Sequence, residues 1–252
     1  MYSGRMRISE PWSKVDGALD QMPRRPQRLA HTVVEDVLGR ILRGDLPAGS
    51  VLPTEPELGS HYGVSRNVIR EAVKSLEEKG MVRARQGFGT TVNPEDEWNI
   101  LDPVVLSLGV KYDKDLQFQK EVVSLRVALE GQMAAQAAEQ AVAEDIAELH
   151  DILDRMSQKT GDPKEYLDLD FEFHGAIMKI SGNRLARRTV RNVHEQVRRQ
   201  LQGVLVTDSE LAVTHAEHRA MFEAISSKDP AAAQAAVVEH ILSAWSRRTE
   251  QP

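Results

Sequence analysis

A carboxylate and an imidazole lie four positions apart in the stretch DLDFEFH, which contains Asp170 and His174. On an α-helix, residues at this spacing project from one face, so both side chains can reach the same ion. The chain contains no cysteine, which limits any metal site to nitrogen and oxygen ligands. The two residues are therefore candidate ligands of a metal ion, or else an ordinary surface or capping pair.

Two further histidines complete a four-ligand set. His218 and His240 flank the segment SSKDP, in which Asp229 and Pro230 predict the start of a new helix. The two helices then form an antiparallel hairpin, and at about 1.5 Å per residue the histidines end up nearly level. One carboxylate and three histidines suit zinc, nickel or manganese, and donor type alone does not select among them. His215 lies close to the same helix face and is an alternative ligand, so spacing alone leaves the metal site open.

The composition is that of a soluble protein with room for two domains: 252 residues, of which 41% are apolar and 28% charged. No apolar run approaches the roughly 20 residues needed to cross a bilayer, and the N-terminus lacks the apolar segment of a secretory signal. We therefore expect a cytoplasmic protein without membrane contact. Residues 24–92 hold 11 Lys/Arg against 8 Asp/Glu, whereas residues 93–252 hold 18 against 27. This asymmetry favours a polyanionic partner for the N-terminal part alone.

Residues 27–93 have the element order of a winged helix-turn-helix domain. Apolar residues recur at helical spacing from Leu29 to Leu42. The segment TEPE then predicts a helix start capped by Thr54, with proline in the first turn. Ser65 predicts the N-cap of a third helix, RNVIREAVKSLEEKG, and the segment MVRARQGFGTTVN that follows predicts a small β-hairpin.

The third helix carries the side chains of a DNA-recognition helix. A helix N-terminus in a major groove presents amide groups to phosphates and side chains to base edges. Arg66 and Arg70 lie on one face of its first turns, and the hairpin turn can reach the adjacent groove. The alternative, a solvated helix with ordinary surface arginines, does not account for the whole order of elements. We predict DNA contacts from Ser65, Arg66, Asn67, Arg70, Gln86 and Gly87.

The remainder of the chain is expected to be helical almost throughout. It has no alternation of strands and helices and no glycine-rich phosphate loop, so it predicts a helical bundle rather than an α/β enzyme domain. The chain is thus mainly α, with a flexible tail (1–26), a winged helix-turn-helix domain (27–93), a linker (94–102) and an all-α domain (103–248). The predicted helices of that domain span 103–109, 115–140, 143–159, 163–181, 183–206, 210–227 and 230–248.

The residues of both regions match a known family. The segment LPAGSVLPTEPELGSHYGVSRNVIREAVKSLEEKGMVRARQGFGTTV resembles the winged-helix domain of GntR-type transcription regulators. The ordered ligand set, within LDFEFHGAIMKISGN and HRAMFEAI, resembles the metal-binding form of the FCD-type ligand domain of the FadR subfamily. The resemblance covers about residues 27–248. Relatives often carry an arginine where this chain has Pro56, so one DNA contact of those relatives is absent.

The resemblance also implies what the C-terminal domain binds. It implies a divalent metal, zinc in the first place with nickel or manganese as alternatives, held by His218 rather than His215 beside Asp170, His174 and His240. The connector EDEWNILDPVVLSL resembles that of regulators of sugar-acid catabolism. The implied effector is therefore a small carboxylate, either a sugar acid or a hydroxy acid.

Two residues are candidates to contact this effector. The resemblance makes Arg126 a candidate to bind its carboxylate, because a guanidinium holds a carboxylate at two points. The alternative for Arg126 is an ion pair within its helix, with Glu121 or Glu130. Thr214, one helical turn before His218, is a candidate hydrogen-bond partner of an effector hydroxyl, and its alternative role is to cap its helix.

These features predict a ligand-responsive repressor that binds a palindromic operator in double-stranded DNA as a homodimer. The effector at the metal site is expected to release the operator. A metal-sensing regulator is one alternative, and a metalloenzyme with a DNA-binding appendage is another. No motif places a spare carboxylate as a general base, so we expect no enzymatic activity.

Overall fold

The computed structural model describes residues 25–159, 161–200 and 207–249. The chain divides between Trp98 and Asn99 into two compact units, each described here by itself. The division lies inside the segment 94–102 that the sequence suggests as a linker. The predicted tail, 1–26, falls outside the described residues except for its last two positions, which begin the first helix.

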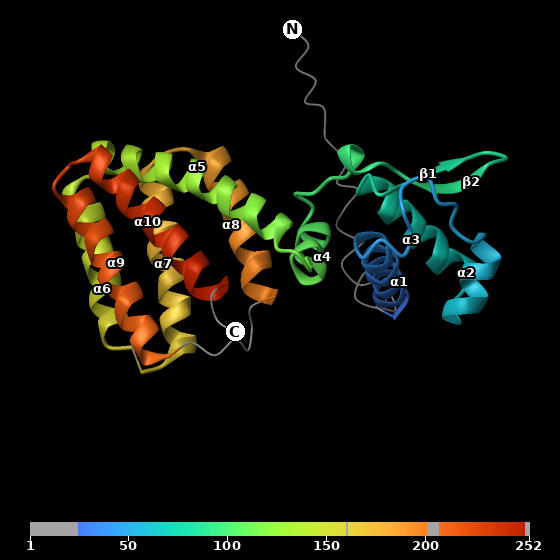
Figure 1. The fold of residues 1–252 in the computed structure, drawn as a ribbon, viewed down its shortest axis with the longest axis horizontal. Helices are drawn as coiled ribbons and strands as arrows, with labels where there is room; N and C mark the ends of the chain where they lie inside the picture. The colour runs from blue at the N-terminus through green and yellow to red at the C-terminus, as the bar shows by residue number, and fades with distance from the viewer. Residues whose placement is uncertain (1–24, 160, 201–206, 250–252) are drawn as a thin grey trace, which may run out of the picture. The chain divides into compact units, whose positions relative to one another are not determined.

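The N-terminal unit is a winged helix-turn-helix, which confirms the predicted fold class of this region. Its first helix starts at Arg25, one turn before the apolar stripe that begins at Leu29. This first turn is polar, so the apolar pattern of the sequence does not reveal it. The elements in order are α1 (Arg25–Leu42), α2 (Glu55–Tyr62), α3 (Arg66–Glu78), β1 (Val82–Arg85) and β2 (Gly89–Val92), followed by a 3-10 turn, Glu95–Glu97 (Figure 1).

Helix α3 packs on α1 and leaves its opposite face exposed. The two helices are in contact, and Val34 and Leu38 of α1 and Ile69 and Leu76 of α3 are all buried. The burial of one face fixes the rotation of α3 about its axis. The polar side chains of its first turns must therefore project away from the core.

The turns of this unit follow from local chemistry. Thr54 and Glu57 form the predicted capping box, in which the Thr54 backbone N–H donates to Glu57 Oε2 at 2.8 Å. Gly63 ends α2 with φ at 64°, in the left-handed region that glycine enters without a steric penalty. Ser65 occupies the N-cap position of α3 with an extended backbone, but its side chain makes no capping hydrogen bond.

The wing is a two-stranded antiparallel hairpin. Val82 lies opposite Val92, and Arg85 lies opposite Gly89. Gly87 and Gly89 both have φ at 83°, so the turn between the strands depends on residues without a Cβ.

The C-terminal unit is all-α, as predicted. Aspartates cap several of its helices: Asp102 accepts from Val104 N, and Asp162 accepts from Glu165 N. The predicted helix 183–206 is described as far as Gln200, and residues 201–206 lie outside the described residues. The elements are α4 (Pro103–Tyr112), α5 (Gln117–Gln140), α6 (Ala143–Ser157), α7 (Pro163–Ile180), α8 (Arg184–Gln200), α9 (Asp208–Ser226) and α10 (Pro230–Thr249) (Figure 1).

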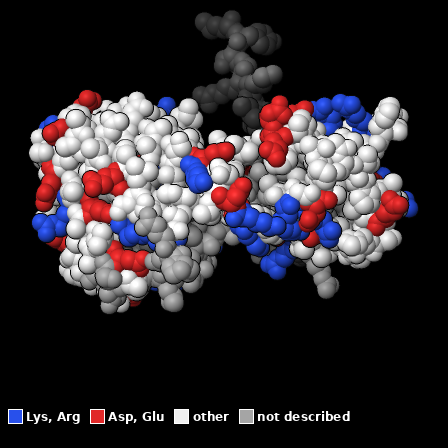
Figure 2. All heavy atoms as spheres, in the orientation of Figure 1, with Lys and Arg blue, Asp and Glu red and all other residues white. Residues whose placement is uncertain are grey.

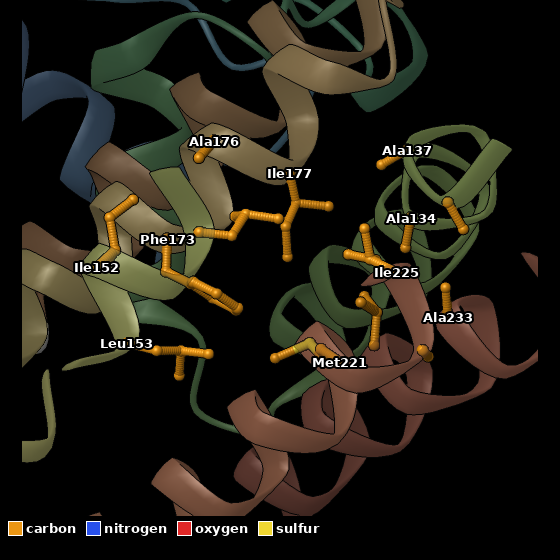
Figure 3. Packing of buried hydrophobic residues seen from close by; sticks show 14 of the residues in the cluster. Ala134, Ala137, Ile152, Leu153, Phe173, Ala176, Ile177, Met221, Ile225 and Ala233 are labelled. Atoms are coloured by element: carbon orange, nitrogen blue, oxygen red, sulfur yellow. The ribbon is translucent and has the colours of Figure 1, made fainter. Parts of the chain in front are cut away.

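Small residues let α10 lie close to α5. Ala134 on α5 and Ala233 on α10 are fully buried in the main core, and a Cβ on Gly131 would lie 3.0 Å from the Val238 side chain. Figure 3 shows Ala134, Ile177 and other apolar side chains of this core converging between the helices. This close packing brings the polar residues of α5 within reach of those on α7 and α10.

Candidate metal centre and DNA-recognition residues

Four side chains from three helices meet inside the C-terminal unit. Helix α7 supplies Asp170 and His174, α9 supplies His218, and α10 supplies His240, and their four ligand atoms all lie within 4.8 Å of one another. The three imidazoles are buried, whereas 27% of the Asp170 side chain is exposed. The predicted hairpin forms, because Asp229 accepts from Ala232 N and so begins α10 immediately after the turn.

The Nε2 atoms of His174 and His218 point into this cluster. Asp170 Oδ1 lies 3.0 Å from His218 Nε2 and 3.9 Å from His174 Nε2, and the two nitrogens are 3.3 Å apart. The His240 ring lies 4.8 Å from the His218 ring and 5.0 Å from the His174 ring, measured between centroids. Four lone-pair donors thus converge on one small volume.

Two of the imidazoles have an oxygen partner at their other nitrogen, and the third faces an oxygen at a longer distance. His218 Nδ1 lies 3.2 Å from Tyr166 Oη, and His240 Nδ1 lies 2.8 Å from Glu217 Oε2. The His174 Nδ1 atom lies 3.7 Å from a buried carboxylate oxygen of α5. An acceptor at Nδ1 favours the tautomer that carries its proton there, which leaves Nε2 free as a metal ligand.

The charge states of the cluster suit metal binding. Burial, together with repulsion from the other imidazoles, lowers the pKa of His174 to about 3, and burial also lowers the pKa of His218. Burial opposes ionisation of Asp170, but the hydrogen bond from His218 and the charge interactions with the surrounding imidazoles together outweigh it and hold the pKa of that carboxyl well below its usual range. Near neutral pH these residues are two neutral imidazoles and a carboxylate, the forms that bind a metal.

The surroundings of the cluster also fit a divalent ion. Glu130 Oε2 is buried without a hydrogen-bond partner and is the oxygen that faces His174 Nδ1. A small movement of the His174 ring toward it closes the 3.7 Å gap and satisfies both groups. An all-nitrogen-and-oxygen set of one carboxylate and three imidazoles suits zinc, nickel or manganese.

His215 lies outside this cluster. Its ring packs against Tyr166, with 6.3 Å between centroids, and it lines a surface pocket with His150 and Phe222. Among the described residues, His218 and not His215 lies with the other three candidate ligands.

Arg126 pairs with Glu130, which was the alternative to an effector contact. Its Nε donates to Glu130 Oε1 at 2.7 Å, and only 17% of its side chain is exposed. His194 Nε2 lies 2.9 Å from the same oxygen. Burial alone would raise the pKa of Glu130, but these two groups hold it well below its usual range. Glu130 therefore lies between Arg126 and the candidate ligand His174.

Thr214 belongs to a second network beside the ligands. It does not cap α9, because Thr207 occupies the N-cap and accepts from Glu210 N. Its hydroxyl accepts from Arg247 Nη2 at 3.3 Å, and Arg247 Nη1 donates to Glu217 Oε1 at 2.8 Å. Thr214 is thus connected to the carboxylate that holds His240.

Four residues were not predicted to support the candidate ligands, although Glu130, one of them, was named as a possible partner of Arg126. They carry no distinctive motif, and the groups that they support lie mainly on other helices. The sequence contains only weak indications of these residues: Glu130 lies four positions after Arg126, and Glu217 directly precedes His218. The four are Glu130, Tyr166, His194 and Glu217.

The residues predicted to contact DNA lie on the exposed face of the N-terminal unit. Those of α3 are exposed, while Val68 and Ile69 between them are buried. Figure 2 shows basic and acidic side chains interleaved on the visible face of each unit, so a uniform basic surface does not mark the DNA-binding part in that view. All six are exposed: Ser65, Arg66, Asn67 and Arg70 at the start of α3, and Gln86 and Gly87 at the tip of the wing.

Within the described part of the chain, no helix has the length and apolar character required to span a membrane.

Each of the two units matches a known protein family. Residues 29–92 match the bacterial regulatory proteins of the gntR family, and residues 121–243 match the FCD domain. The uncharacterized HTH-type transcriptional regulator YieP of Escherichia coli (strain K12) is 34% identical over 159 residues, 62% of this chain and 69% of the relative. The galactonate operon transcriptional repressor of the same organism is 29% identical over 212 residues, 84% of this chain and 93% of the relative.

A solved structure shows the same fold. It is that of Lar, which controls the expression of the Listeria monocytogenes agr system, and it matches with a TM-score of 0.57 and 18% identity over 88% of this chain and 98% of that one. The matched families and relatives are transcription regulators and not enzymes. The chain therefore belongs to the gntR family of bacterial regulatory proteins, with an FCD domain, and is a DNA-binding, ligand-responsive transcription regulator.

Proposed function

We propose that this regulator is a repressor that a small sugar-acid or hydroxy-acid carboxylate releases from its operator, and that the acid binds at a divalent metal ion. The observation that carries the proposal is the convergence of Asp170, His174, His218 and His240 within 4.8 Å. The name of the galactonate operon repressor, similar to this chain over most of its length, supports a sugar acid as the ligand class.

Different side chains are assigned to different groups of the acid. Asp170, His174, His218 and His240 would hold a divalent ion, zinc in the first place, which would supply a Lewis acid for oxygens of the effector. Arg126 offers a guanidinium for its carboxylate, and its Nε bond to Glu130 leaves both Nη groups to make a two-point contact. The Thr214 hydroxyl, next to Arg247, can bond an effector hydroxyl. Asp170 is the one ligand with an exposed side-chain fraction above one tenth, which favours entry of the acid from its side.

Operator binding is assigned to the N-terminal unit. Regulators of this family bind operator DNA and are typically dimeric. We assign the contacts to Ser65, Arg66, Asn67 and Arg70 on α3, with the wing tip at Gln86 and Gly87, working in the cytoplasm on a palindromic operator. For the acid to release DNA, it must bind the DNA-incompetent arrangement more tightly, and a 100-fold preference corresponds to roughly 2.7 kcal/mol.

A thermal-shift screen of the zinc-loaded full-length chain tests the proposal. Aldonic, uronic and short hydroxy acids are added singly, and each acid that raises Tm is then tested for release of DNA bound to the protein. An acid at 100 times its Kd stabilises the domain by about 2.7 kcal/mol. His218→Ala is expected to abolish both zinc binding and the response to the acid, whereas His215→Ala keeps both.

Two outcomes overturn the proposal in different ways. If zinc or nickel alone releases DNA and no acid has an effect, the chain is a metal sensor. If acids shift Tm equally with and without metal, and His218→Ala retains that shift, the acid site is elsewhere.

A further inference from the structure

One ion pair joins the two helices of the helix-turn-helix on its exposed face. Arg70 Nε on α3 donates to Glu55 Oε2 on α2 at 2.9 Å, with 65% and 38% of the two side chains exposed. An ion pair this exposed contributes about 0 to 1 kcal/mol to stability. Stability therefore gives little reason for a carboxylate to face the residue that is assigned to read DNA.

The bond has a specific effect on the Arg70 side chain. It uses Nε, and no second acceptor among the described residues contacts the guanidinium. The two Nη groups remain, and two neighbouring N–H donors are what an arginine uses to bind O6 and N7 of a guanine. The arginine side chain has many rotamers, and this bond removes part of that freedom before DNA binds.

Glu55 is itself held on a rigid turn. It is the first residue of α2 and lies inside the capping box that Thr54 and Glu57 close. Pro56 follows it and fixes the backbone of the first turn, while Leu58 anchors the helix in the core. The backbone that carries the Glu55 carboxylate is therefore already fixed before DNA binds.

We propose that Glu55 is a specificity-determining residue that positions Arg70 for one guanine and penalises every other sequence. The inference rests on the proposed contact of Arg70 with DNA. A carboxylate on this face repels the phosphates of any duplex, and only a guanine in reach of Arg70 offsets that cost. Specificity is a difference of affinities, so this repulsion increases discrimination while it lowers non-specific binding. Residue 56 is proline, so no arginine directly follows Glu55 to neutralise it.

The test measures discrimination base pair by base pair with the full-length chain. Random-sequence duplexes are enriched on the wild-type protein. The Kd is then measured by fluorescence anisotropy, at one fixed salt concentration, for the enriched duplex, each of its single base-pair substitutions and a scrambled duplex. The variants are Glu55→Ala, Glu55→Gln, Arg70→Ala and the double variant of Glu55→Ala with Arg70→Ala. Glu78→Ala, which removes an equal charge from the far end of α3, is the matched control.

The wild-type protein is expected to lose about 10-fold to 100-fold in affinity when the guanine read by Arg70 is replaced. Glu55→Ala reduces that loss to about 3-fold or less and strengthens binding to the scrambled duplex. Glu55→Gln also strengthens scrambled binding but keeps part of the discrimination, because its amide oxygen still accepts from Arg70 Nε. The double variant is expected to discriminate no less than Arg70→Ala alone. Glu78→Ala is expected to keep the wild-type Kd values for all duplexes.

Full discrimination at that base pair in Glu55→Ala overturns the inference and leaves the Arg70 contact intact. An equal loss at every base pair also overturns it, because a positioning role acts at one base pair in each half-site. If Arg70→Ala itself keeps all discrimination, the Arg70 contact in the proposed function fails as well.

Discussion

Replacing Glu130 with glutamine changes one charge in the buried network that supports the candidate metal ligands. Glu130 Oε1 accepts from Arg126 Nε at 2.7 Å and lies 2.9 Å from His194 Nε2, while Oε2 faces His174. An amide has one acceptor oxygen and no charge, so at least one bond is lost and Arg126 loses its counter-charge. The variant tests whether this carboxylate supports both the fold and the metal site.

The expected cost follows from the burial of the pair. Removing one partner of a buried ion pair costs about 3–5 kcal/mol, and a charged hydrogen bond about 1.5–3 kcal/mol. Because glutamine retains one acceptor for Arg126, we expect Glu130→Gln to lower the free energy of unfolding by about 2–3 kcal/mol. Loss of an oxygen partner behind a metal ligand weakens metal binding by about 10-fold to 100-fold.

Urea unfolding of the full-length chain, followed by circular dichroism, measures the first effect. Competition for zinc with a chromophoric chelator measures the second. Glu148→Gln is the control, because Glu148 pairs with Lys179 at 3.2 Å on the surface and its loss should cost less than about 0.5 kcal/mol. Wild-type stability and zinc affinity in Glu130→Gln would refute the reasoning. A loss of stability with unchanged zinc affinity would limit Glu130 to a structural role.

Three further predictions concern the metal, pH and packing. Chelation should lower the Tm of the zinc-loaded wild-type chain but leave that of His240→Ala unchanged, as scanning calorimetry can check. Although burial opposes ionisation of Asp36, the hydrogen bond from Tyr62 helps to lower its pKa below 3.8. The unfolded state then binds the proton first, so the stability that Asp36 adds is present above about pH 4 and lost below it. In urea titrations at several pH values, the difference between the wild type and Asp36→Asn should shrink progressively as the pH falls below about 4 and through the lowered pKa of Asp36; a constant difference would contradict this. Gly131→Leu should cost about 1–3 kcal/mol of unfolding free energy, because its Cβ meets Val238 at 3.0 Å.

The secondary structure was largely predictable, because its signals are local. Helix α6 was predicted at 143–159 and spans Ala143–Ser157, and α7 was predicted at 163–181 and spans Pro163–Ile180. Caps, prolines and apolar periodicity act within a few residues, so they mark these boundaries without tertiary information. The apolar stripe of α1 was predicted from Leu29 onward, whereas the helix begins at Arg25, because its first turn is polar and leaves no apolar pattern in the sequence.

The four candidate ligands were predictable for the same reason in part. That Asp170 and His174 share one face follows from the repeat of a single helix. That His218 and His240 lie at the same height follows from a capped helical hairpin. Which histidine of α9 faces the cluster could not be derived from spacing, because His215 and His218 lie close in rotation about the helix axis. The packing of α9 against its neighbours decides it, and it turns His215 toward a surface pocket.

The sequence by itself determined the order of elements, the family resemblance and the residue types of the candidate metal site. Only the tertiary structure showed that Glu130, Tyr166 and Glu217 stand behind the three imidazoles, and that Glu55 holds Arg70. The physical reason is that positions within a helix follow from its repeat, whereas distances between helices depend on how side chains fill the space between them. In this chain each of these pairs joins two different helices, and no local sequence pattern indicates which polar groups the packing of the helices brings together.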